Sequence, residues 1–160
     1  MMRIRYWLIF WMLWGCFSAT GAGAFSCQVS AGTLNFPSYN FLSSFPTDST
    51  ATLRISCNIP DQNPRAPLAV TLSIGSGTSG SFSQRQMYSL SGGSDSLKYN
   101  LFTNASYSSI LGDGTGSSTT LTQRVSKSAP WNVVVYGRIP PNQKVPAGQY
   151  RDSLIVTIDW

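Results

Sequence analysis

The sequence predicts an all-β fold of the immunoglobulin-like sandwich type, and three observations support this class. Short apolar runs alternate with polar residues at period two, the pattern of a strand with one buried face. Clusters of Gly, Pro, Ser and Asn separate these runs at short intervals, as turns do. After the first 24 residues, no segment has the periodicity of an amphipathic helix. Seven or eight short strands with such spacing are typical of a β-sandwich.

The expected strands can be placed in chain order by their alternation and by the breaks between them. Prolines mark connecting loops between 37 and 46 and between 60 and 67, because proline cannot donate to a strand ladder. The stretches 75–83 and 103–118 are polar and rich in glycine, so we expect loops there, the first of them flexible. Strands are expected at 27–32, 33–36, 49–58, 68–74, 86–90, 97–101, 121–125, 131–139 and 152–160.

The last of these strands raises a question about its free edge. Its alternation places Leu154, Val156, Ile158 and Trp160 on one face. The printed sequence ends within this strand, and an apolar edge strand with unpaired backbone groups is normally covered. We therefore expect either an earlier strand or another molecule to cover that edge.

Residues 1–24 have the three-part build of a secretory signal peptide. Arg3 and Arg5 precede an apolar run over 6–17, and small residues precede a cleavage site that we place after Ala24. This run is shorter than the roughly 20 residues of a spanning helix, which disfavours a retained anchor. Acylation of Cys16 is a second alternative, disfavoured by the bulky Trp14 at the cleavage position. We expect one mature domain, residues 25–160, with no stable membrane anchor.

The predicted export favours a disulfide bond between the cysteines of the mature chain. Without Cys16, the mature chain keeps Cys27 and Cys57, an even pair in an oxidising compartment where disulfides form. Cys57 shares the inward face of its strand with Leu53 and Ile55, which suits a buried bridge. Closing a loop of about 30 residues contributes roughly 3–4 kcal/mol in the chain-entropy model. A reactive thiol is the alternative, and the chain has no His to activate one.

Charge and composition exclude several functions. The formal net charge is +5, and loss of Arg3 and Arg5 leaves nine basic residues against six acidic ones. These basic residues are scattered, so we expect no nucleic-acid partner. The chain has no His and no Glu, which excludes His-based triads, His zinc sites and paired-Glu chemistry. We therefore expect a protein that is not an enzyme.

Two glycine-rich motifs resemble ligand loops but lack what the chemistry needs. Gly75, Gly77 and Gly80 match the dinucleotide fingerprint, yet no helical start follows to hold a pyrophosphate. The stretch 112–116 resembles a calcium loop but contributes only the carboxylate of Asp113. We expect no cofactor and no metal ion.

Five short blocks follow one another in order along the chain: Arg-Gln-Met at 85–87, Leu-Lys-Tyr-Asn-Leu at 97–101, Leu-Gly-Asp-Gly at 111–114, Val-Tyr-Gly-Arg-Ile at 135–139 and Pro-Ala-Gly-Gln-Tyr-Arg-Asp at 146–152. Together with Cys27 and the terminal strand, they resemble the spore coat protein U domain family. The members of that family in Gram-negative bacteria are pilin subunits of archaic chaperone–usher systems. The resemblance covers the chain from Cys27 to Trp160.

This resemblance implies an incomplete immunoglobulin-like sandwich that lacks its last strand. A periplasmic chaperone would supply a strand during folding, and an outer-membrane usher would exchange it for the N-terminal strand of another pilus subunit. The protein would cross the inner membrane to the periplasm and then reach the cell surface in a pilus. A complete, closed sandwich is the alternative. The walls of the implied acceptor groove would be formed by Leu34, Phe36, Leu154, Val156, Ile158 and Trp160.

The sequence departs from the pilin pattern before its first cysteine. A shaft subunit carries an alternating apolar donor segment there, whereas the expected mature chain has only Phe25 and Ser26 before Cys27. Earlier cleavage would add only the small residues of 18–24. We therefore expect a structural subunit that accepts a strand without donating one, at the tip or another minor position. A free-standing secreted β-module that binds a surface glycan or protein is the alternative.

Overall fold

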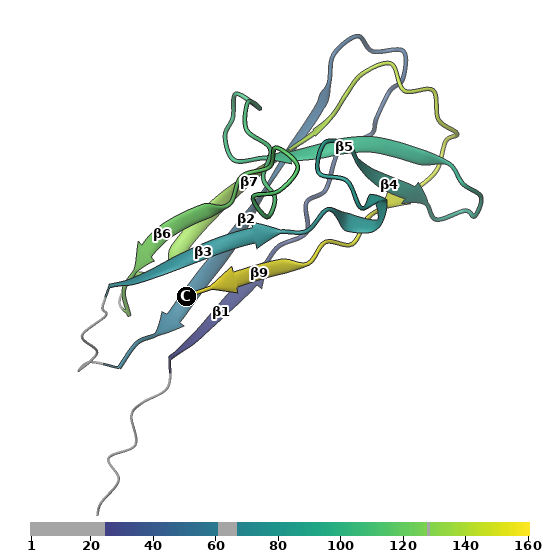
Figure 1. Cartoon of the computed structure of the whole chain (residues 1–160). Coiled ribbons are helices and arrows are strands. Elements are labelled where there is room, and N and C mark those ends of the chain that lie inside the picture. The colour runs from purple at the N-terminus through teal and green to yellow at the C-terminus, as the bar shows by residue number, and fades with distance from the viewer. Residues whose placement is uncertain (1–24, 61–66, 128) are drawn as a thin grey trace, which may run out of the picture.

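The computed structural model describes residues 25–60, 67–127 and 129–160, and these form two antiparallel sheets that pack on each other (Figure 1). The larger sheet has the strand order β1-β2-β7-β5-β4-β8, and the smaller sheet has the order β6-β3-β9. The predicted all-β class is therefore confirmed. The strands are β1 (Ser26–Ala31), β2 (Thr47–Asn58), β3 (Leu68–Ile74), β4 (Arg85–Ser89), β5 (Ser96–Phe102), β6 (Leu121–Val125), β7 (Trp131–Ile139), β8 (Tyr150–Arg151) and β9 (Val156–Asp159).

The hydrophobic core lies between the two sheets and is built from the alternating residues of the central strands. Strand β7 buries every second side chain from Trp131 to Ile139, and β3 does the same from Leu68 to Ile74. Each large aliphatic side chain that is buried in this way contributes roughly 1.5–3 kcal/mol. The alternation that predicted these strands is thus the alternation that forms the core.

The disulfide joins the first two strands of the larger sheet. The antiparallel register of β1 and β2 places Cys27 directly opposite Cys57, and the two sulfur atoms are bonded. Cys57 is buried and points into the core, as its position on the inward face predicted. The closed loop contains the connection from β1 to β2, including residues 32–46.

We expect a thiol reagent to modify neither Cys27 nor Cys57 in the unreduced mature protein. The intact mass should match a chain that starts at Phe25 and has lost two hydrogen atoms to one bridge. Replacing both cysteines by serine should lower the free energy of unfolding by roughly 3–4 kcal/mol, because the unfolded chain regains the freedom of the loop. Labelling of either cysteine before reduction would contradict the bridge. The predicted signal peptide, with Cys16, lies outside the described residues.

The predicted terminal strand at 152–160 is shorter in the structure, where only β9 lies within it and residues 152–155 are not part of a strand. Strand β9 pairs with β3 in the smaller sheet, whereas β8, directly before the predicted strand, pairs with β4 in the larger sheet. Between them, both oxygens of the Asp152 carboxylate accept hydrogen bonds, from Tyr99 Oη at 2.7 Å and from Thr78 N at 3.0 Å. These bonds hold the chain at the point where it crosses from one sheet to the other.

Two further segments differ from the sequence-based expectation. Residues 33–36 alternate inward and outward as predicted, but no ladder joins them to another strand in the described part of the chain. The expected flexible loop at 75–83 contains a short 3-10 helix, Gly77–Ser79. Thr78 in this helix also donates its hydroxyl to Asp152 at 2.8 Å, which fixes the turn. A cofactor phosphate would have to compete with that carboxylate for the same backbone N–H.

A buried arginine connects the two sheets, and nothing in the sequence marks it as structural. Arg85 of β4 is completely buried and lies at the end of β3. Its guanidinium donates to the carbonyl oxygens of Ile74, Gly75 and Leu111 at 2.8–3.2 Å, and to Asn100 Oδ1 at 2.7 Å. Burial lowers the pKa of Arg85 from its ordinary value, because desolvation penalises the charged form. Hydrogen bonds of this number keep a buried guanidinium satisfied.

Candidate functional site

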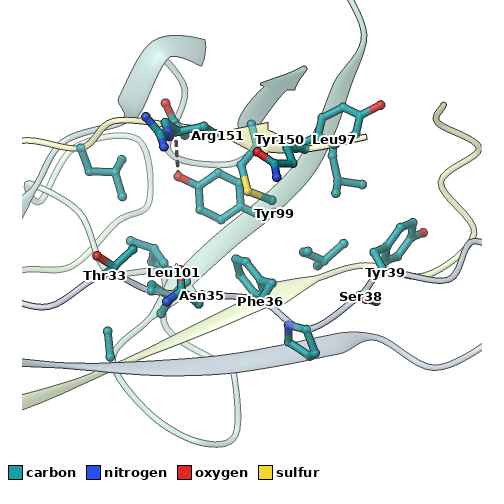
Figure 2. A pocket seen from close by; sticks show the side chains of 18 of the residues that line it. Thr33, Asn35, Phe36, Ser38, Tyr39, Leu97, Tyr99, Leu101, Tyr150 and Arg151 are labelled. Carbon is teal, nitrogen blue, oxygen red and sulfur yellow. Dashed lines mark hydrogen bonds between the residues drawn. The ribbon is translucent and has the colours of Figure 1, made fainter. Parts of the chain in front are cut away.

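A long groove runs along the molecule between two extended segments of the chain, residues 31–41 and residues 145–156. Figure 2 shows Thr33, Asn35 and Phe36 along one side and Tyr150 and Arg151 along the other, with Tyr99 between them. The cavity volume is about 1210 Å³. Pockets for small molecules have roughly 300–1000 Å³, so this groove has room for a larger, elongated ligand.

The floor of the groove is the hydrophobic core itself. Side chains of four strands reach it from the larger sheet, and one side chain at the end of β3 reaches it from the smaller sheet. Leu53 and Leu101 on this floor belong to the hydrophobic core and are almost completely buried. The groove therefore leads directly onto the core between the two walls. The residues of the floor include Leu53, Ile74, Met87, Leu97, Leu101 and Val135.

The first wall lies on strand β7, and a glycine makes this close approach possible. Leu34 and Phe36 are half-buried and pack against the core. A Cβ atom on Gly137 would lie 2.6 Å from Leu34 Cδ2 and 2.8 Å from Phe36 Cζ, which is closer than real Cβ contacts. The ring of Phe36 also meets Tyr99 edge to face, with centroids 6.0 Å apart. Gly137 in the Val-Tyr-Gly-Arg-Ile block therefore leaves the space that lets the first wall lie close to the sheet.

Replacing Gly137 by valine should lift the first wall from the sheet. The added methyl groups would occupy the space of Leu34 and Phe36, and overpacking of this kind costs about 1–3 kcal/mol. Limited proteolysis within 33–36 should become faster, because the lifted segment becomes accessible to a protease. The control is Asn132→Val, which places the same side chain on the exposed face of the same strand. Unchanged cleavage within 33–36 in Gly137→Val would show that the glycine does not position the wall.

The second wall is the chain that crosses from β8 to β9. Leu154 and Val156 are half-buried and line the groove, while Ser153, Ile155 and Thr157 are exposed. Near the middle of this wall, Tyr99 Oη donates to the Asp152 carboxylate, the dashed line in Figure 2. Burial raises the pKa of Tyr99, with a further contribution from this hydrogen bond, so its hydroxyl remains protonated and remains a donor.

The structure brings four of the six predicted groove residues together. Leu34 and Phe36 line one wall and Leu154 and Val156 line the other. Ile158 is half-buried beside the core and pairs with Leu72 of β3, outside the groove lining. Trp160 is 52% exposed and also lies outside the lining. Ile158 and Trp160 thus continue the alternation of Leu154 and Val156 past the residues that line the groove.

Backbone groups along both walls are available for pairing. Strand β9 pairs with β3 at one edge, and in the described part of the chain no strand pairs with its other edge. Residues 33–41 of the first wall have no backbone–backbone hydrogen bond to another strand within residues 25–60, 67–127 and 129–160. Asn35 O accepts a hydrogen bond from the Ser49 hydroxyl, and Tyr39 Oη accepts from Gln143 N at 2.7 Å. A groove with apolar pockets and free main-chain groups has the chemistry that binds an extended strand.

The described residues also bear on a metal site and on a membrane-spanning helix. No group of three or more His, Cys or Asp side chains is close enough to hold a metal ion there. No helix in the same residues is long and apolar enough to cross a membrane. Asp113, the single carboxylate of the suspected calcium loop, accepts hydrogen bonds from Thr115 N and Thr115 Oγ1 at 2.9 and 2.7 Å.

Two packed antiparallel sheets with an open groove along the core define an all-β protein of the immunoglobulin-like sandwich class. The chain belongs to the Spore Coat Protein U domain family, whose model matches residues 13–157. The match confirms the resemblance carried by the five blocks of sequence. It also covers almost all of the described residues, so the groove lies within the family domain.

Solved structures with a similar fold include the chaperone–tip adhesion subunit pre-assembly complex CsuC–CsuE from the archaic chaperone–usher Csu pili of Acinetobacter baumannii. The TM-score is 0.59 at 22% identity over 86% of this chain, which spans 40% of the length of that chain. The chaperone–tip adhesin complex of CFA/I fimbriae has a TM-score of 0.48 at 15% identity, with 82% and 40% of the two chains covered. The Escherichia coli Hda pilus minor tip subunit HdaB has a TM-score of 0.37 at 16% identity, with 84% and 82% covered. No curated protein matches the chain.

Proposed function

We propose that this protein is a structural subunit of a chaperone–usher surface pilus and that a strand donated by another protein fills its groove. The observation that carries the proposal is the open groove between residues 31–41 and 145–156. Its floor is the hydrophobic core, and its walls offer unpaired backbone groups and inward apolar side chains. An extended strand can pair with the backbone groups through main-chain hydrogen bonds and can fill the apolar pockets with its side chains.

An unfilled groove of this kind is a hazard during folding. Exposed apolar strand edges pair with other chains and lead to aggregation. A periplasmic chaperone that lends a strand would cover the groove until the outer-membrane usher replaces it with a strand of another pilus subunit. Export by the signal peptide at 1–24 brings the protein to the periplasm, and assembly places it on the cell surface. The similar fold of a chaperone-bound pilus subunit supports the chaperone and the other pilus subunits as partners.

The protein accepts a strand without donating one. The stretch 18–24 before the domain has only small side chains, which cannot fill apolar pockets. The one large apolar residue next to it, Phe25, packs against the protein's own core. A chaperone–usher fibre is a head-to-tail series in which each contact needs one groove and one donor strand. A subunit without a donor strand is exported first and occupies the distal tip.

Immunogold labelling of intact fibres tests the proposal. We expect one cluster of gold at the distal tip of each fibre, and none in a strain that lacks the gene. Label repeated along the shaft would contradict the tip position but leave the pilus function intact. Fibres of normal number and length without any label would contradict the function itself.

A further inference from the structure

A turn at one end of the groove presents large apolar side chains to solvent. Phe41 is 42% exposed, Leu42 is 79% exposed and Phe45 is 77% exposed. Single exposed apolar residues are common on protein surfaces, but three of this size within five residues form a patch, and such patches mark interaction sites. We call residues 41–45 the apolar turn.

The apolar turn is held in place by its own hydrogen bonds. Ser43 N donates to Asn40 O at 3.1 Å, and Leu42 N donates to Asn40 Oδ1 at 3.0 Å. Phe45 N donates to the hydroxyl of Ser43 at 3.1 Å. These bonds fix Phe41 and Leu42 at the centre of a tight turn, with little freedom left to lose on binding. A surface that is ordered in advance binds a partner at a lower entropic cost.

The apolar turn is continuous with the groove. Phe41 lines the end of the first wall, and Leu90, which is 53% exposed, lines the groove from the other side. Leu90 N donates to Gln149 O at 2.8 Å, which ties it to the second wall. At the opposite end of the groove, β1 and β9 contact each other (Figure 1). A strand in the groove therefore has its open exit between Phe41 and Leu90.

The chemistry of this surface favours a protein partner that stays bound. Residues 31–47 contain no charged side chain, so the surface offers no cation for an anionic lipid headgroup. The nearest charge in the sequence is the carboxylate of Asp48, which is paired with Arg138 at 2.7 Å. Interfaces of permanent complexes are more hydrophobic than those of transient complexes. The subunit that remains in the fibre is a better match than a chaperone that leaves.

We propose that the apolar turn, together with Leu90, is the docking surface for the folded body of the pilus subunit that donates its strand to this groove. This inference rests on the proposed function and adds a second contact to it. The strand leaves the groove between Phe41 and Leu90, and the body to which it is attached then covers the exposed side chains. Strand and body together fix the angle between the two subunits.

Site-specific photo-cross-linking in the producing bacterium tests this contact in intact fibres. A benzophenone side chain is placed at Leu42 in one variant and at Val156 in another, and the cross-linked peptides are identified by mass spectrometry. At Val156 we expect a peptide from the N-terminal strand of a second subunit. At Leu42 we expect a peptide from the folded domain of that same subunit.

The two positions separate the failure of this inference from the failure of the proposed function. A cross-link at Val156 to a donated strand, without one at Leu42, would overturn the docking surface and leave the function standing. If the Val156 variant is still captured by the chaperone, the absence of a pilus-subunit peptide there would overturn the function. A cross-link at Leu42 to the chaperone alone would also overturn the inference, because the occupant would then be transient.

A double variant, Leu42→Ser with Phe45→Ser, measures the importance of the contact. Both side chains are exposed, so the fold and capture by the chaperone should be unchanged. The number of fibres that carry this subunit should fall about tenfold, because truncation of large apolar anchors removes the strongest contacts of an interface. Val134→Ser, which removes an exposed apolar side chain from β7, is the control and should have no effect. Normal fibre incorporation of the double variant would contradict the inference.

Discussion

If a chaperone captures this protein as proposed, replacing Val156 by lysine should abolish that capture, whereas Thr157→Lys should be tolerated. Val156 points into the groove and Thr157 points to solvent, because successive residues of a strand face opposite sides. A lysine at 156 would place a charge in an apolar groove without a partner, at a cost of several kcal/mol. Every 1.4 kcal/mol is tenfold in affinity, so capture should fall by at least about a hundredfold.

The measurement is recovery of the protein with an affinity-tagged chaperone from the periplasm of cells that produce both. Thr157→Lys is the matched control, since it adds the same side chain one residue away on the other face. Ile158→Lys should also abolish capture, but through loss of the packing of β9 on β3, since Ile158 lies outside the groove lining. Equal loss at 156 and 157 would contradict this register of the second wall.

Replacing Arg85 by methionine should prevent accumulation of the folded protein. The substitution leaves the buried carbonyl oxygens of Gly75 and Leu111 and the amide oxygen of Asn100 without the guanidinium that bonds them. Each buried acceptor that loses its donor costs about 1–3 kcal/mol. Domains are stable by only about 5–15 kcal/mol in total. Lysine should not rescue the variant, because one ammonium cannot reproduce the planar fork of donors.

The amount of soluble protein in the periplasm, with the chaperone co-produced, measures this effect. Arg124→Met is the control, because Arg124 is exposed on β6 and its loss should leave the amount unchanged. If Arg85→Met accumulates like the unsubstituted protein, the hydrogen bonds of the guanidinium do not hold the sheets together.

The sequence was sufficient to predict the strands with strong alternation. The predicted bounds of β7 and β6 agree with the structure. Buried residues alternate with more exposed ones throughout β7, whereas β6 begins and ends at an apolar residue and is exposed between them. The crossing at 152–155 could not be predicted, since it depends on bonds from Thr78 and Tyr99, which are distant in sequence. Residues 33–36 alternate like a strand, but alternation reports only which side chains point inward. It does not report whether the backbone has a partner.

The candidate groove was predicted in part. Leu34, Phe36, Leu154 and Val156 could be named because alternation identified their inward face and the family resemblance identified the groove. Arg85 was missed because its acceptors are backbone oxygens, which have no sequence signature. The only feature of the sequence that pointed to Arg85 was its position in the Arg-Gln-Met block. The apolar turn was taken for a loop because prolines flank it, and exposure cannot be read from apolar composition.

The disulfide also determines how the protein can respond to mechanical load. The first wall of the groove and the apolar turn both lie within the loop that Cys27 and Cys57 close. In the proposed fibre, tension on these surfaces would pass into a covalent ring and not into an open chain. If the sheet yielded under force, the 30-residue separation between the two cysteines would keep roughly 100 Å of chain from extending. The oxidised protein would therefore extend little under load, and reduction would let the same segment extend fully.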